Sequence, residues 1–257
     1  MTAAQIPTIQ LPHGAMPLLG IGTWQSEGDD AEHAVRTALE LGYTHVDTAT
    51  GYGNQAQVGR ALAGTDRNSV FVTTKLPPDH AGRERQTLTE SLTELGLDHL
   101  DLWLVHWPPH KQAWPDTWRQ FIAARDEGLV RDIGVSNYSL DQIDELIDAT
   151  GVAPAVNQIP WSPSDWDAEL VAGHAARGVR IEGYSPFKRT DMDAPALTEI
   201  ADAHGVTPQQ VVLRWHIDHG IVVIPKSVHR ERIAANLDVL GFQLSDDELA
   251  RIDALGA

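Results

Sequence analysis

Residues 70–75 read VFVTTK and residues 101–106 read DLWLVH, and between them Leu88, Leu92 and Leu95 recur at helical spacing. Both apolar runs barely alternate with polar residues, which is typical of parallel strands covered on both faces. A strand, an amphipathic helix and a second strand in this order predict one βαβ unit of a parallel sheet.

The same pattern continues along the rest of the chain. Six further apolar runs predict strands: LLGIG at 18–22, HVDTA at 45–49, RDIGVS at 131–136, PAVNQI at 154–159, VRIEGYS at 179–185 and IVVIPKS at 221–227. Helical patterns lie between them, and Ser139/Gln142 and Thr207/Gln210 form capping boxes. Residues 8–11 and 17–19 predict a short N-terminal β-hairpin.

Eight strands with helical crossovers predict an α/β fold of the (β/α)8 TIM-barrel type, and the length of 257 residues suits one such barrel. An open doubly wound sheet is the alternative. It usually carries G-x-G-x-x-G after its first strand, and here the third glycine of that motif is missing after Gly20-Ile21-Gly22. We therefore expect a single barrel domain over residues 1–257.

The charge and the residue composition of the chain exclude or disfavour several classes of function. The formal net charge is −17, which disfavours nucleic acid and anionic membranes as partners. The chain has no cysteine, which excludes disulfides, thiolate catalysis and zinc–cysteine sites. It shows neither a signal-peptide pattern nor an apolar run long enough to span a bilayer, so we expect a cytoplasmic protein.

Four chemically active side chains fall at or just after three successive strand ends. They are Asp47, Tyr52 five residues later, Lys75 and His106. The carboxyl ends of barrel strands form the active face, so these groups should converge. Each residue alone has an ordinary structural explanation, such as a cap, a surface loop, a solvated charge or a packed ring. Their joint position favours an active site.

These four residues suit carbonyl reduction. We expect the Lys75 ammonium to lower the pKa of Tyr52, so that the phenol can act as the proton donor. Asp47 would keep Lys75 charged and in place, and His106 would donate a hydrogen bond to the carbonyl oxygen. None of them supplies a hydride, so a reduced cofactor must.

The segments HVDTATGYGNQAQVG, VFVTTK and DLWLVHWP resemble the aldo-keto reductases, and the similarity runs over nearly the whole chain. The pattern is most similar to bacterial members related to 2,5-diketogluconate reductase. The resemblance implies that Asp47, Tyr52, Lys75 and His106 form the catalytic tetrad of an NADPH-dependent reductase of aldehydes and ketones.

The resemblance also implies a set of cofactor contacts. GVSNY, AVNQI and GYSPF place Ser136, Asn137 and Gln158 at the nicotinamide carboxamide, Tyr184 against the nicotinamide ring and Ser185 at the pyrophosphate. IPKSVHRERIAAN places Lys226, Ser227 and Arg232 around the adenosine phosphate and Asn236 near adenine. Ala235 stands where a glutamate is common, so fewer adenine contacts are expected.

The substrate side carries fewer signals. Trp24 and Trp107 follow strand ends and should line the pocket. The short C-terminus suggests an open site for a small carbonyl substrate, and we expect a monomer.

Two alternative functions are an NADPH-binding regulatory subunit and a metal-dependent barrel hydrolase. His216 and His219 have i, i+3 spacing but no evident carboxylate partner, so we expect no metal site.

Overall fold

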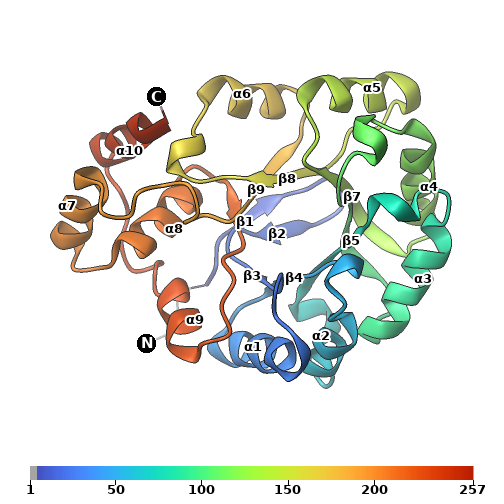
Figure 1. Cartoon of the computed structure of the whole chain (residues 1–257), viewed down its shortest axis with the longest axis horizontal. Coiled ribbons are helices and arrows are strands. Elements are labelled where there is room, and N and C mark those ends of the chain that lie inside the picture. The colour runs from blue at the N-terminus through green and yellow to red at the C-terminus, as the bar shows by residue number, and fades with distance from the viewer. Residues whose placement is uncertain (1–4, 257) are drawn as a thin grey trace.

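Eight parallel strands close into a barrel in the computed structural model of the chain, which describes residues 5–256 (Figure 1). The strands are β3 (Ile21–Gly22), β4 (His45–Asp47), β5 (Phe71–Leu76), β6 (Leu100–Val105), β7 (Val130–Ser136), β8 (Val156–Pro160), β9 (Arg180–Tyr184) and β10 (Val222–Val223). They pair in chain order, and parallel bridges from Leu19 to Val223 and from Gly22 to Lys226 join the last strand to the first. The predicted closed barrel is confirmed, and the open-sheet alternative is wrong.

Helices surround the strands (Figure 1). They are α1 (Gly28–Leu41), α2 (Gln55–Leu62), α3 (Glu84–Leu95), α4 (Pro115–Asp126), α5 (Leu140–Thr150), α6 (Ala168–Ala176), α7 (Pro195–His204), α8 (Pro208–Asp218), α9 (Arg230–Leu237) and α10 (Asp246–Asp253). Short 3₁₀ turns are η1 (Thr50–Tyr52), η2 (Arg67–Ser69), η3 (Pro78–His80), η4 (Pro109–Lys111), η5 (Pro163–Asp165) and η6 (Ala254–Gly256). Among the described residues, no helix has both the length and the apolar character that crossing a membrane requires.

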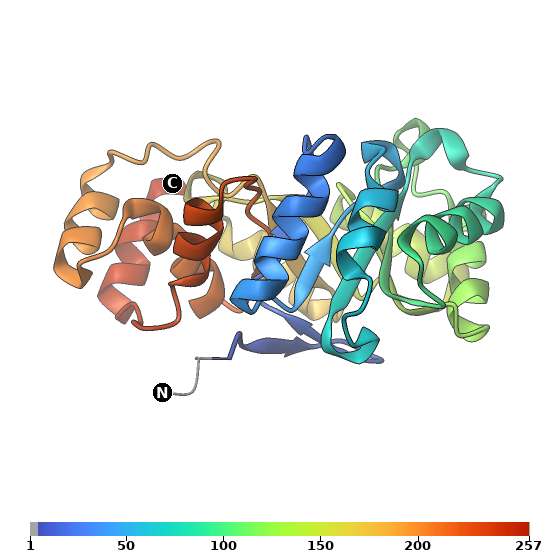
Figure 2. The same ribbon diagram turned by 90° about the horizontal axis from the view of Figure 1, so that it is seen from below.

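The N-terminal hairpin covers one end of the barrel. Strands β1 (Thr8–Gln10) and β2 (Ala15–Pro17) pair antiparallel, as predicted, and lie across the lower end in Figure 2. His13 Nδ1 lies 3.0 Å from an oxygen of Asp132, near the beginning of β7. The hairpin therefore covers the amino ends of the strands, and the carboxyl ends remain open for a site.

Candidate active site

A cavity of about 600 Å³ opens at the carboxyl ends of the strands. It is lined by Gly22, Trp24, Gln25, Asp47, Tyr52, His106, Trp107, Ser136, Asn137, Gln158, Tyr184, Ser185, Pro186, Phe187, Lys188, Ile224 and Lys226. Eleven of the residues predicted for the site from the sequence are in this lining. Lys75 lies beneath the cavity, with a fully buried side chain.

Lys75 and Asp47 form a buried ion pair on the neighbouring strands β5 and β4. Lys75 Nζ donates to Asp47 Oδ1 at 2.6 Å and to the Thr48 carbonyl at 2.8 Å. Burial opposes the charged form of Lys75, but Asp47 and Tyr52 outweigh that effect and raise its pKa. Burial raises the pKa of Asp47 against the opposing effect of Lys75. The structure thus brings these two residues together as predicted.

Tyr52 ends the 3₁₀ turn η1 and lies beside this pair. Lys75 Nζ is 5.2 Å from the centre of the Tyr52 ring. The expectation that Lys75 would lower the pKa of Tyr52 is wrong as a net effect. Burial raises the pKa, and the ammonium only partly offsets that shift. Tyr52 therefore keeps its proton at neutral pH.

His106 follows β6 and meets Tyr52 edge to face, with the ring centres 5.5 Å apart. Burial, together with the charge of Lys75, lowers the pKa of His106 to about 3. The imidazole is therefore neutral at physiological pH and carries one N–H. A neutral N–H donor and a phenol O–H donor thus lie side by side at the base of the cavity.

Ser136, Asn137 and Tyr184 form a hydrogen-bonded group on one wall. The Tyr184 hydroxyl donates to Asn137 Oδ1 at 2.9 Å, and Asn137 Nδ2 donates to Ser136 Oγ at 2.9 Å. Asn137 adopts a φ of 64°, a left-handed conformation that asparagine tolerates better than most residues. These contacts fix the Tyr184 ring at the cavity, where a flat aromatic ligand could stack on it.

Gln158 links the ion pair to a residue that the sequence analysis did not identify. Its Nε2 donates to Asp47 Oδ2 and to Glu182 Oε2, each at 2.8 Å. Glu182 and its neighbour His45 are completely buried. A signal was present in the sequence, because an acid within VRIEGYS and an imidazole within HVDTA are unusual inside buried strands.

The segment after β10 provides the basic residues. Lys226 lines the cavity and is exposed. Ser227 follows it in the chain, and Arg232 and Asn236 lie within α9, outside the lining. Ser227 Oγ accepts a hydrogen bond from the His229 N–H at 3.1 Å. Among the described residues, Lys226 and Arg232 form no ion pair. Neither cation is paired with a carboxylate there, so each could pair with an anion.

Two half-exposed tryptophans border the cavity, as predicted. Trp24 is 49% exposed and Trp107 is 48% exposed, the only large hydrophobic side chains so exposed among residues 5–256. The Lys188 ammonium lies 5.9 Å from the centre of the Trp24 ring. A flat apolar rim of this kind suits a small organic substrate.

The two histidines with i, i+3 spacing have protein partners. His216 contacts the carbonyl oxygens of Val212 and Trp161, and His219 Nε2 lies 2.9 Å from Asp253 Oδ1. Within the described part of the chain, no cluster of three or more potential ligands could hold a metal ion.

The residues present fit a nicotinamide dinucleotide. The cavity offers Tyr184 as an aromatic face, with amide and hydroxyl groups on Asn137 and Ser136 beside it. The cation of Lys226 lies at its edge. Two hydrogen-bond donors, Tyr52 and His106, lie at its base. Such donors can stabilise an oxygen that gains negative charge.

The chain is similar in sequence to known proteins. Residues 18–257 match the sequence model of the "Aldo/keto reductase family". A protein named methylglyoxal reductase DkgA from Salmonella typhimurium is 44% identical over 257 residues, covering 97% of this chain and 94% of that protein. An aldo-keto reductase from Mycobacterium sp. (strain JLS) is 43% identical over 256 residues, covering 97% and 93%.

Solved structures are similar over the same span. The crystal structure of an aldo/keto reductase from Brucella melitensis superimposes with a TM-score of 0.95 at 39% identity, covering 99% of this chain and 100% of that chain. A Bombyx mori aldo-keto reductase in complex with NADP gives a TM-score of 0.92 at 36% identity, covering 98% and 94%.

Proposed function

Because this chain belongs to the aldo/keto reductase family, we propose that it reduces small aldehydes and ketones with NADPH, using Tyr52 as the proton donor. The observation that supports this most strongly is the convergence of Tyr52, His106 and the Lys75–Asp47 pair at the base of one cavity. Residues 1–257 would act as one catalytic domain and as a monomer.

The protein's part in the reaction is to place donors at the carbonyl oxygen. When bound, NADPH supplies the hydride that the carbonyl carbon accepts. Tyr52 O–H and the neutral His106 N–H both donate to the oxygen, and Tyr52 then gives up its proton. The Lys75 ammonium stabilises the resulting phenolate, and Asp47 holds Lys75 in position. Hydride and proton together convert the carbonyl to an alcohol.

We assign the cofactor contacts as the sequence suggests. Ser136, Asn137 and Gln158 would meet the carboxamide, Tyr184 the nicotinamide ring and Ser185 the pyrophosphate. The adenosine phosphate would be held by Lys226, Ser227 and Arg232, and Asn236 would lie near adenine. The related Bombyx mori structure, which is in complex with NADP, supports the choice of cofactor.

Small dicarbonyls are the proposed substrates. One relative is named a methylglyoxal reductase, and the rim formed by Trp24 and Trp107 is half exposed and apolar. An open rim with polar donors only at the base should discriminate weakly among small aldehydes and α-dicarbonyls. Steady-state NADPH consumption with a panel of such compounds tests this. One substrate turned over far more efficiently than every analogue would contradict it.

Tyr52→Phe tests the proposed chemistry directly. The change removes the phenolic proton and keeps the ring, so kcat should fall by roughly 10²–10⁴-fold, the range of a general acid. NADPH affinity, measured by quenching of tryptophan fluorescence, should barely change. A variant that keeps more than about half of the wild-type rate, with chemistry rate-limiting, would show that Tyr52 is not the donor.

A further inference from the structure

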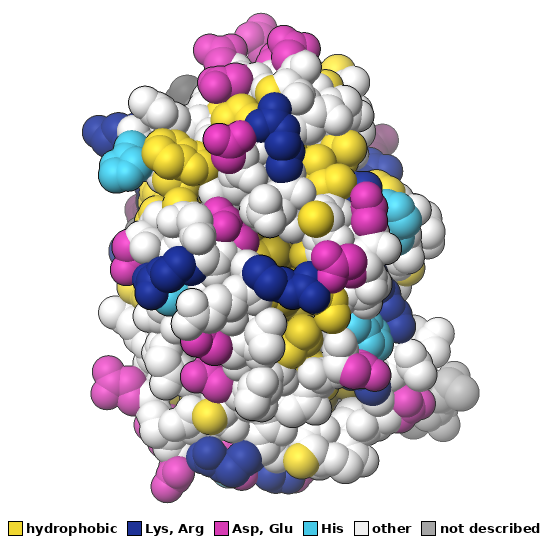
Figure 3. All heavy atoms as spheres, turned by 90° about the vertical axis from the view of Figure 1, so that its right-hand side faces the viewer, with side chains coloured by type: hydrophobic (Ala, Val, Ile, Leu, Met, Phe, Trp, Pro, Cys, Tyr) yellow, Lys and Arg dark blue, Asp and Glu magenta, His cyan; other side chains and the backbone are white. Residues whose placement is uncertain are grey.

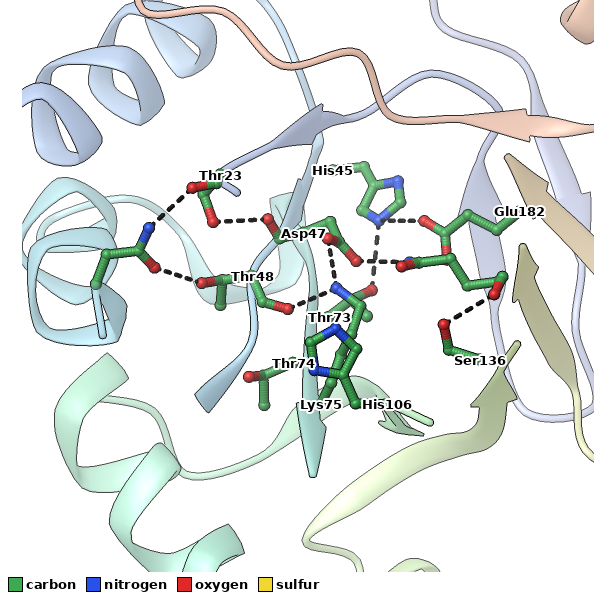
Figure 4. Close-up of polar contacts among 12 residues, drawn as sticks. Thr23, His45, Asp47, Thr48, Thr73, Thr74, Lys75, His106, Ser136 and Glu182 are labelled. Carbon is green, nitrogen blue, oxygen red and sulfur yellow. Dashed lines mark hydrogen bonds and ion pairs between the residues drawn. The ribbon is translucent and has the colours of Figure 1, made fainter. Parts of the chain in front are cut away.

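A second buried acid lies below the proposed catalytic residues. Glu182 in β9 is completely buried, and the single amide nitrogen of Gln158 donates both to Glu182 Oε2 and to Asp47 Oδ2. Figure 4 shows Glu182 and Asp47 directed into the same part of the barrel interior. The orientation of the Gln158 amide therefore depends on both carboxyl groups.

His45 lies beside Glu182 and belongs to the same strand as Asp47. Its Nε2 is 3.7 Å from Glu182 Oε1 and 3.4 Å from Thr73 Oγ1, and Figure 4 shows the ring facing Glu182. Glu182 Oε1 has no hydrogen-bond partner within residues 5–256. A Cβ atom on Gly20 would lie only 2.5 Å from His45 Nδ1. The glycine therefore leaves the space that this buried imidazole occupies.

The titratable groups that face Glu182 come from three elements. Strand β4 contributes Asp47 and His45, β5 contributes Lys75, and η1 contributes Tyr52. The adjacent strands β8 and β10 carry no titratable side chain. His216 of α8 packs against Gly183, which neighbours Glu182 in β9.

Lys75 is the single buried cation in this group, and Asp47 already neutralises it. An ionised Glu182 would be a second, uncompensated buried negative charge, which is strongly disfavoured. Burial and the charge of Asp47 raise the pKa of Glu182 to about 8. Burial and Lys75 lower the pKa of His45 to about 3. At neutral pH Glu182 is therefore protonated and His45 is neutral.

We propose that neutral Glu182 is a positioning residue, which holds the Gln158 amide against Asp47 and so keeps Lys75 and Tyr52 in their working arrangement. This role rests on the proposed function of Tyr52. Ionisation of Glu182 would add a negative charge beside the ion pair. That charge makes loss of the Tyr52 proton less favourable, so carbonyl reduction should slow as pH rises through the titration of Glu182.

The first test is the pH dependence of kcat in the wild type, Glu182→Gln and Glu182→Leu. With a pKa of about 8, about a tenth of Glu182 stays neutral at pH 9, so wild-type kcat should fall about tenfold from its neutral-pH value. The amide introduced by Glu182→Gln cannot ionise, so the alkaline decline of this variant should move to higher pH. The exposed acid Glu169 supplies a matched control, because Glu169→Gln should keep the wild-type profile.

The Glu182→Leu variant tests whether the hydrogen bond from Gln158 matters, and not only the volume of the side chain at position 182. Glu182→Leu fills similar space but cannot accept from Gln158, so kcat should fall at least tenfold at pH 7 with a smaller change in KM. Glu182→Gln should recover most of that loss. An alkaline decline in Glu182→Gln that superimposes on the wild type would overturn the proposal.

A spectroscopic test does not depend on turnover or on the folding of the leucine variant. Infrared difference spectra of wild-type protein labelled with ¹³C-glutamate should show a protonated carboxylic acid at pH 7 that disappears at alkaline pH. The same signal should be missing from Glu182→Gln. A wild-type spectrum without a protonated glutamate at pH 7 would overturn the proposal. Tyr52→Phe tests the underlying function separately, because its loss of activity does not depend on Glu182.

Discussion

At the level of single residues, Asp47 contributes most to keeping Lys75 charged. Its side chain is completely buried, and its ion pair with Asp47 spans 2.6 Å. Lys75→Met would leave Asp47 as an unpaired buried charge, which costs roughly 3–5 kcal/mol of unfolding free energy. Urea denaturation measures this loss, and carbonyl reduction should also collapse. Lys111→Met, at an exposed lysine, should change stability by less than about 0.5 kcal/mol.

A double variant shows whether the unpaired charge is the cause. Asp47→Asn removes the charge that Lys75→Met leaves behind. The double variant should therefore be more stable than Lys75→Met alone, although one further native side chain is changed. If the loss of unfolding free energy in the double variant equals the sum of the losses in the two single variants, the charges do not interact and the pair contributes packing only.

Part of the arrangement of these residues could be predicted from the sequence, and part could not. Asp47, Tyr52, Lys75 and His106 could be placed together, because successive strand ends of a barrel share one rim. The direction of the Tyr52 pKa shift could not be predicted, because it depends on how completely the fold buries the phenol. The contact of Glu182 with Gln158 depends on side-chain geometry between neighbouring strands, which the spacing of residues in the chain does not reveal.

At the level of elements, helices α2 and α3 pack closely at a glycine. A Cβ atom on Gly59 would lie 2.4 Å from the Glu94 carbonyl oxygen and 2.8 Å from that of Leu95. Backbone atoms cannot move aside as a flexible side chain can, so Gly59→Ala should cost about 1–3 kcal/mol despite alanine's higher helix propensity. Thermal unfolding measures the loss. Gly241→Ala, where nothing lies within 4 Å of the added atom, should cost much less.

Most elements could be predicted, whereas their ends could not. The capping boxes at Ser139 and Thr207 form as expected, because both hydrogen bonds of each box are local. The strand predicted over residues 221–227 is only Val222–Val223 as a regular element. Pro225 has no N–H to donate to the next strand, so regular pairing stops there. Isolated hydrogen bonds continue beyond it, such as the one from Gly22 N–H to the Pro225 carbonyl. Apolar patterning alone does not show where regular pairing stops.

At the level of the whole molecule, the charge distribution opposes the proposed cofactor. The net charge of −17 creates a field that repels a polyanion. On the face shown in Figure 3, Asp and Glu side chains are spread over the surface, and Lys and Arg occur in small separate groups. A dinucleotide phosphate therefore needs a local cluster of cations to overcome the mean field.

Residues 226–232, which run from the loop after β10 into the first turn of α9, hold three such cations, and they predict a preference for NADPH over NADH. Arg230 is paired with Glu40 at 3.0 Å, whereas Arg232 is exposed and Lys226 faces the cavity. Barrel phosphate sites commonly use the loops after strands seven and eight, and an arginine can bind phosphate in a bidentate way. Arg232→Ala should therefore raise the KM for NADPH roughly tenfold or more and leave NADH kinetics nearly unchanged.

Arg230→Ala is the matched control for this last comparison. It removes the same charge from the same turn of α9, but from a side chain already paired with Glu40, so KM should change little for either cofactor. Because the attraction of Arg232 is electrostatic, the effect of Arg232→Ala should shrink as ionic strength rises. Equal kcat/KM for NADPH and NADH in the wild type, or equal damage to both in Arg232→Ala, would contradict a phosphate site at this helix.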